Sequence, residues 1–133
     1  MPRMIDTVSS RKPKILVVDD YADARGTLRE ALEERGYGVL EAAHVQEALN
    51  VLVSNAPRSI ELILLDLQMP VMDGWQLLRV LKSYVGLRQI PVLVVSAHAP
   101  RLHEANHPGV VGVLHAPYAI DELLELVQTC LSH

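Results

Sequence analysis

The sequence predicts an α/β fold in which helices cover both faces of a doubly wound, five-stranded parallel sheet. Short apolar runs rich in β-branched residues alternate along the chain with segments whose apolar residues recur at the helical period. The connections between these segments are short, and crossovers between parallel strands are right-handed. Together these observations favour β-α units repeated five times within one domain.

The strands are the more clearly marked elements. Unbroken apolar runs are typical of strands that are buried on both faces, as in a parallel sheet. The predicted strands lie at Ile15–Val18, Ile60–Leu65, Val92–Val95 and Val110–Leu114, with a weaker run at Tyr37–Ala42.

Apolar stripes at helical spacing predict four helices. Gly36 follows the first stripe and is suited to the residue just past a helix end. Pro100 and Pro108 bracket a segment, 101–107, that leaves room for about two further helical turns. The stripes are Ala24, Leu28, Ala31 and Leu32; Val45, Ala48, Leu49 and Leu52, ended by Asn55 and Pro57; Leu77, Leu78 and Leu81, capped by Asp73; and Ile120, Leu123, Leu124, Val127 and Leu131.

Length and composition exclude several classes of protein. A chain of 133 residues is the size of one domain, and its single cysteine, Cys130, excludes an internal disulfide. Twelve basic against 16 acidic residues, with no Phe and one Trp, make a nucleic-acid partner unexpected. No apolar run approaches the roughly 20 residues that span a bilayer. We expect a cytoplasmic domain at 13–133, with no membrane partner, after a disordered lead-in at 1–12.

Acidic residues stand where two predicted strands end. Asp19 and Asp20 follow the first strand, and Asp66 directly follows Leu65 of the third. In an open α/β sheet the ligand site lies at the carboxyl ends of the strands, so these side chains should meet. Three neighbouring carboxylates repel one another unless a cation neutralises them, and a hard divalent ion with oxygen ligands is the usual solution. The pattern indicates a Mg²⁺ (or Mn²⁺) site beside an aspartate that can act as a nucleophile.

Three stretches in this order resemble the receiver domain of two-component response regulators. They are the run at 14–20 ending in Asp19-Asp20, the Asp-x-x-Met-Pro-x-Met-Asp-Gly stretch within 64–74, and the run at 94–97 that includes Ser96. The resemblance extends over about residues 13–131. It implies a flavodoxin-like strand order, 2-1-3-4-5, and a phospho-acceptor signalling domain rather than an enzyme.

The resemblance also implies a role for each matching residue. Asp66 would accept a phosphoryl group from a histidine kinase or a histidine phosphotransfer protein. Asp20 would bind Mg²⁺ directly, Asp19 through a water, and the backbone carbonyl of Gln68 would supply a further ligand. The Ser96 hydroxyl would bond a phosphoryl oxygen.

One departure from the family lies just after the fifth strand. The family has a lysine before the proline that corresponds to Pro117, and here that position is Ala116. A methyl group cannot replace the positive charge beside three negative ones. His115 is adjacent, but successive strand residues point to opposite faces, so we expect its imidazole to face away.

The other departures concern the switch. Val113 stands where the family usually has an aromatic residue that turns inward on activation. The segment after Ser96 is short and proline-bounded, although in the family it belongs to the face, with the fifth strand and the last helix, that binds downstream proteins. His98, two residues after Ser96, occupies a position that tunes the lifetime of the phosphoryl group in the family.

Other functions compete with this interpretation. A pseudo-receiver would keep the fold as an interaction module without phosphorylation, and Ala116 and Val113 favour it. An aspartyl-phosphate hydrolase would carry a second aspartate two residues after the nucleophile, where this chain has Gln68. A flavin or nucleotide binder would need a phosphate cradle after the first strand, and Asp19-Asp20 would repel phosphate there unless a metal intervened.

Overall fold

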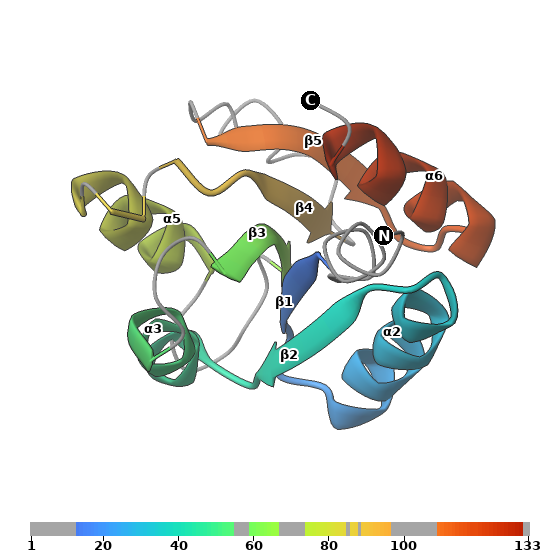
Figure 1. Cartoon of the computed structure of the whole chain (residues 1–133), viewed down its shortest axis with the longest axis horizontal. Helices are drawn as coiled ribbons and strands as arrows, with labels where there is room; N and C mark the ends of the chain where they lie inside the picture. Colours follow the sequence, from blue (N-terminus) through green and yellow to red (C-terminus); the bar gives the residue numbers. More distant parts are fainter. Residues whose placement is uncertain are drawn as a thin grey trace, which may run out of the picture.

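The computed structural model describes residues 13–54, 59–66, 74–84, 86–87, 89–96 and 109–131, with only the main chain at 74, 75 and 96. Five parallel strands form one sheet in the order β2-β1-β3-β4-β5, as the resemblance implied (Figure 1). The elements are β1 (Lys14–Val18), α2 (Ala22–Glu34), β2 (Gly38–Ala42), α3 (Val45–Ser54), β3 (Ile60–Asp66), α5 (Gly74–Ser83), β4 (Val92–Ser96), β5 (Val110–His115) and α6 (Ile120–Leu131).

Helices cover both faces of the sheet, α2 and α6 on one side and α3 and α5 on the other (Figure 1). Each face of the sheet has a hydrophobic core, and side chains of β1 contribute to both, because successive strand residues point to opposite faces. Ile15 and Val17 pack toward α2 and α6, whereas Leu16 and Val18 pack toward α3 and α5. All four side chains are fully buried, which confirms for β1 the prediction of a strand covered on both faces. The prediction is wrong for β5, where Val111 is exposed and only Leu114 is fully covered, because this strand lies at the edge of the sheet.

The end of α2 lies where the sequence predicted it. Gly36 has a φ of 92°, a conformation that glycine adopts without steric strain. Its amide donates to the carbonyl of Glu33 at 3.0 Å, and the Tyr37 amide donates to that of Leu32 at 3.2 Å. This Schellman arrangement uses the Tyr37 amide to close the helix, so β2 begins at Gly38 rather than at Tyr37 as predicted.

Several predicted features lie outside the described residues. They include the lead-in at 1–12, the residues expected to end the second helix and to cap the third, and the possible helix between the two prolines at 100 and 108. Within the described part of the chain, no helix is long and apolar enough to cross a membrane.

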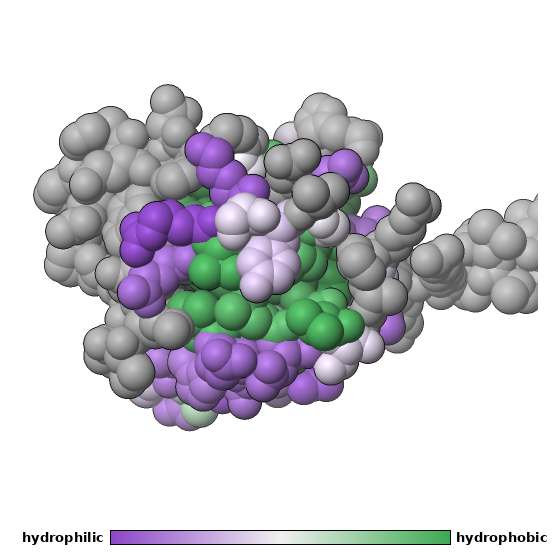
Figure 2. All heavy atoms as spheres, turned by 90° about the vertical axis from the view of Figure 1, so that its left-hand side faces the viewer, coloured by the Kyte–Doolittle hydropathy of each residue, from purple (hydrophilic) through white to green (hydrophobic). Residues whose placement is uncertain are grey.

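The side of the molecule that carries α3 and α5 has apolar surface. Figure 2 shows apolar side chains gathered in the middle of this side and hydrophilic ones along its border. Val53 near the end of α3 and Tyr84 just after α5 are exposed. Single exposed apolar residues are common on protein surfaces, so these two do not by themselves indicate a binding site.

Candidate functional site

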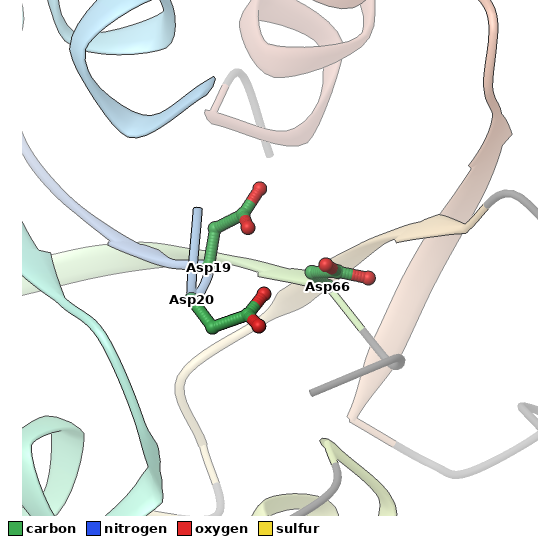
Figure 3. A group of neighbouring side chains, drawn as sticks. All are labelled: Asp19, Asp20 and Asp66. Carbon is green, nitrogen blue, oxygen red and sulfur yellow. The ribbon is translucent and has the colours of Figure 1, made fainter. Parts of the chain in front are cut away.

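Three carboxylates meet at the carboxyl ends of β1 and β3. Val18 pairs with Leu65 in the parallel register, so the residues that follow them, Asp19 and Asp66, are neighbours across the sheet. Asp20 comes next along the chain, and Figure 3 shows the three side chains together at the ends of β1 and β3. One oxygen from each of the three side chains lies within 4.8 Å of the others. The structure thus brings together the three acidic residues that the sequence singled out.

The spacing of these oxygens suits a small, hard cation. Mg²⁺ binds oxygen ligands at about 2.0–2.1 Å, so two ligands on opposite sides of an octahedron lie about 4.2 Å apart. Oxygens within 4.8 Å of one another therefore need only a small movement, or one bridging water, to share such an ion. All three donors are carboxylates, the ligand type that Mg²⁺ prefers.

The carboxyl of Asp19 is half-buried, and its surroundings shift its pKa. Burial raises the pKa of its carboxyl, and the negative charge of Asp20 raises it further. A hydrogen bond from the Tyr21 amide to Asp19 Oδ1, 3.0 Å long, and the charge of Arg25 act in the opposite direction. The net effect is an upward shift, so the ionised form of Asp19 is disfavoured here, and a bound cation would favour it.

Arg25, on the first turns of α2, contacts the end of β1. Its Nη1 donates to the backbone carbonyl of Asp19 at 2.8 Å, and its Nε donates to Glu41 Oε1 at 3.1 Å. No local pattern in the sequence indicates this contact, because Arg25 and Glu41 lie on different elements, α2 and β2.

Tyr118 is a second residue whose role was not predicted from the sequence. Its side chain is half-buried and packs against the core beneath α2 and α6. Burial raises the pKa of its phenol, and the charges of Asp19 and Asp66 raise it further.

The residues that depart from the receiver-domain pattern lie in or just after β5. Ala116 is half-buried, and the peptide bond that joins it to Pro117 is cis. His115 is exposed and pairs in register with the main chain of Ser96. Val113 is half-buried and packs against the core on the side of α3 and α5.

Other predicted site residues are only partly described or not described. Ser96 is the last residue of β4, and its side chain lies outside the described part of the structure. Gln68 and His98 are likewise outside the described residues.

The sequence is similar to known proteins along most of its length. Residues 15–128 match the response regulator receiver domain family. Sporulation initiation phosphotransferase F of Bacillus subtilis is 32% identical over 118 residues, which are 89% of this chain and 93% of that protein. The chemotaxis protein CheY of Pseudomonas aeruginosa is 33% identical over 118 residues, 86% of this chain and 93% of that protein.

Solved structures give the same result. CheY4 of Vibrio cholerae superposes with a TM-score of 0.81 at 28% identity, covering 90% of this chain and 99% of that one. The response regulator TrrA of Thermotoga maritima, solved in complex with Mg²⁺ and BeF, has a TM-score of 0.78 at 26% identity and covers the same shares of the two chains.

Some relatives are much longer than this chain. NtrC of Proteus hauseri is 30% identical over 125 residues, but these make up only 25% of its length. The shared part is the receiver domain in every comparison above, and receiver domains interact with histidine kinases or phosphotransfer proteins and bind Mg²⁺ at an acidic pocket. The chain belongs to the response regulator receiver family, and it is a phospho-accepting signalling domain of the two-component type.

Proposed function

We propose that Asp66 is the phospho-acceptor of this domain and that Asp19 and Asp20 hold Mg²⁺ beside it. The observation that carries the proposal is the approach of the three carboxylates to within 4.8 Å at the edge of the sheet. Asp66 ends β3, so a rigid strand fixes its main chain. The complex of TrrA with Mg²⁺ and BeF supports the same choice of ion.

The chemistry is phosphoryl transfer between two side chains. A carboxylate oxygen of Asp66 forms a bond to the phosphorus of a phosphohistidine on the donor protein. The bond from phosphorus to the imidazole nitrogen breaks, the imidazole keeps the electron pair, and it then takes up a proton. When bound at Asp19 and Asp20, Mg²⁺ would supply positive charge that stabilises the negative charge of the phosphoryl group.

The remaining site residues belong to this proposal as assigned from the family. The Ser96 hydroxyl bonds a phosphoryl oxygen, the Gln68 carbonyl is a further metal ligand, and His98 tunes the lifetime of the acyl phosphate. Ala116 lacks the cation that the family has there, so we expect slower transfer than in an ordinary receiver domain. Val113 lacks a ring, so the switch on the face of β5 and α6 is altered.

The mode of action follows from the same site. Residues 13–133 act as one cytoplasmic domain whose phosphorylated form is recognised by a protein at the face of β5 and α6. The domain signals and does not turn over a small substrate. A pseudo-receiver remains the second candidate, because Ala116 removes a charge that the reaction uses.

Mass spectrometry separates the two candidates. The protein is incubated with Mg²⁺ and a small phosphodonor, and its intact mass is measured over time beside an ordinary receiver domain. We expect a single phosphoryl adduct on the wild type and none on Asp66→Asn or in the presence of a chelator. The absence of an adduct on the wild type, when the reference domain is labelled, would support the pseudo-receiver instead.

A further inference from the structure

Arg25 connects three elements at the edge of the sheet where the carboxylates meet. It lies on α2, donates to the main chain that follows β1, and donates to Glu41 on β2. Its side chain is 17% exposed and that of Glu41 is 26% exposed, so the pair is largely shielded from water. A hydrogen bond from a shielded, charged donor is stronger than one at an open surface.

Both main-chain polar groups of Asp19 make hydrogen bonds. Its amide donates to the Ala42 carbonyl at 3.1 Å, and its carbonyl accepts from Arg25 at 2.8 Å. The carbonyl of Asp19 belongs to the same planar peptide unit as the amide of Asp20. A donor that fixes this carbonyl therefore fixes the direction in which Asp20 leaves the strand.

Glu41 holds the guanidinium in this position. It also accepts a 2.8 Å bond from Arg29, and Arg29 pairs with Glu33 at 3.1 Å. The four side chains carry two positive and two negative charges, so their formal sum is zero. The charge of Arg25 favours the ionised form of Asp19, and its hydrogen bond to the Asp19 carbonyl adds a geometric effect on the main chain.

We propose that Arg25 is a positioning residue of the acidic metal site: its hydrogen bond to the Asp19 carbonyl, braced by Glu41, sets the main chain so that Asp19 and Asp20 face Asp66. This inference rests on the proposed metal-binding role of these carboxylates. It assigns to α2 a part in the site that no charge or ligand pattern in the sequence indicated.

A matched pair of variants tests the proposal. Arg25→Met removes the bond to Asp19, whereas Arg29→Met removes a bond to the same Glu41 without any bond to Asp19. Mg²⁺ affinity is measured by calorimetry at fixed pH and ionic strength. Loss of a group that orients metal ligands typically weakens metal binding about 10–100-fold, and we expect this for Arg25→Met. Arg29→Met should bind Mg²⁺ like the wild type.

Further measurements separate positioning from general stability. Arg25→Lys keeps the charge and one donor group and should recover part of the affinity. The Tyr21 amide, which donates to the Asp19 carboxylate, reports the local geometry, and its NMR shift should move in Arg25→Met but not in Arg29→Met. Should Arg25→Met unfold, the comparison between Arg25→Lys and Arg29→Lys takes its place, with weaker Mg²⁺ binding expected only in the former.

The results distinguish failure of this inference from failure of the proposed function. Equal Mg²⁺ affinity in the Arg25 and Arg29 variants, with wild-type binding that depends on Asp66, would overturn only the role of Arg25. Wild-type protein whose Mg²⁺ binding is the same as that of Asp66→Asn would overturn the proposed metal site, and the role of Arg25 with it.

Discussion

Asp19 and Asp66 present carboxylate oxygens within 4.8 Å of each other from the ends of two adjacent strands. Like charges at this distance oppose folding when no cation lies between them. The arrangement therefore lowers the stability of the metal-free domain and creates a place where a cation can bind.

Removing one charge from the cluster should stabilise the metal-free protein. Burial raises the pKa of Asp19 above 3.8, so the folded state holds this proton more tightly than the unfolded state. The associated stability is present below the unfolded pKa and is lost as pH rises through the folded pKa. Asp19→Asn removes this unfavourable charge. It should therefore raise the free energy of unfolding near neutral pH by about 0.5–2 kcal/mol, the range typical of substitutions that optimise charge.

Urea denaturation without Mg²⁺ measures this effect. Glu34→Gln, which removes an exposed acid at the end of α2, serves as the control for net charge. An equal gain in both variants would show that the carboxylates do not repel one another more than surface acids do.

Mg²⁺ should stabilise the folded wild type. A ligand that binds only the folded state at ten times its Kd adds about 1.4 kcal/mol to the free energy of unfolding. We expect the melting temperature to rise with Mg²⁺ and to return after chelation, whereas Asp66→Asn should respond far less. An identical response in Asp66→Asn would place the ion elsewhere.

A lysine at position 116 should accelerate phosphorylation. Ala116 is half-buried at the end of β5, and a cation there would stabilise the charge that develops during transfer. We expect Ala116→Lys to raise the initial rate of labelling by a small phosphodonor by about tenfold, which corresponds to about 1.4 kcal/mol. Ala119→Lys adds the same charge at an exposed position nearby and should leave the rate near that of the wild type.

Glu41 should stabilise the fold in a pH-dependent way. Its pKa is lowered, chiefly by the hydrogen bond from Arg29, so its contribution is present above the unfolded value of 4.5 and is lost as pH falls through the folded pKa. Glu41→Gln should cost about 0.5–1 kcal/mol near neutral pH, since Arg29, its main partner, is 45% exposed. In strongly acidic buffer the two unfolding curves should coincide, and a difference that persists there would contradict an ionic origin.

Two glycines should respond to alanine in opposite directions. A Cβ on Gly112 in β5 would lie 3.0 Å from Cδ1 of the fully buried Leu93, whereas a Cβ on Gly26 in α2 would meet nothing within 4 Å. Gly112→Ala should lower the free energy of unfolding by about 1–3 kcal/mol through overpacking. Gly26→Ala should raise it by about 0.5–1 kcal/mol through helix propensity. Thermal denaturation of both variants checks the pair, and destabilisation by Gly26→Ala would contradict the open environment.

Local patterns in the sequence predicted much of the fold. The unbroken run at Ile15–Val18 indicated a strand covered on both faces, and Gly36 indicated the end of the first helix. The start of β2 was placed one residue early, because the Tyr37 amide is used by the helix that precedes it. That competition between two elements for one donor does not appear in a hydropathy pattern.

The sequence by itself determined the order of the strands and helices and the residue types at the strand ends. Strand ends in a parallel sheet share one edge, so the meeting of Asp19, Asp20 and Asp66 followed from topology alone. Only the tertiary structure decided what surrounds them. The hydrogen bond from Arg25 to the Asp19 carbonyl joins residues from different elements, and it depends on how the helices pack against the sheet rather than on spacing along the chain.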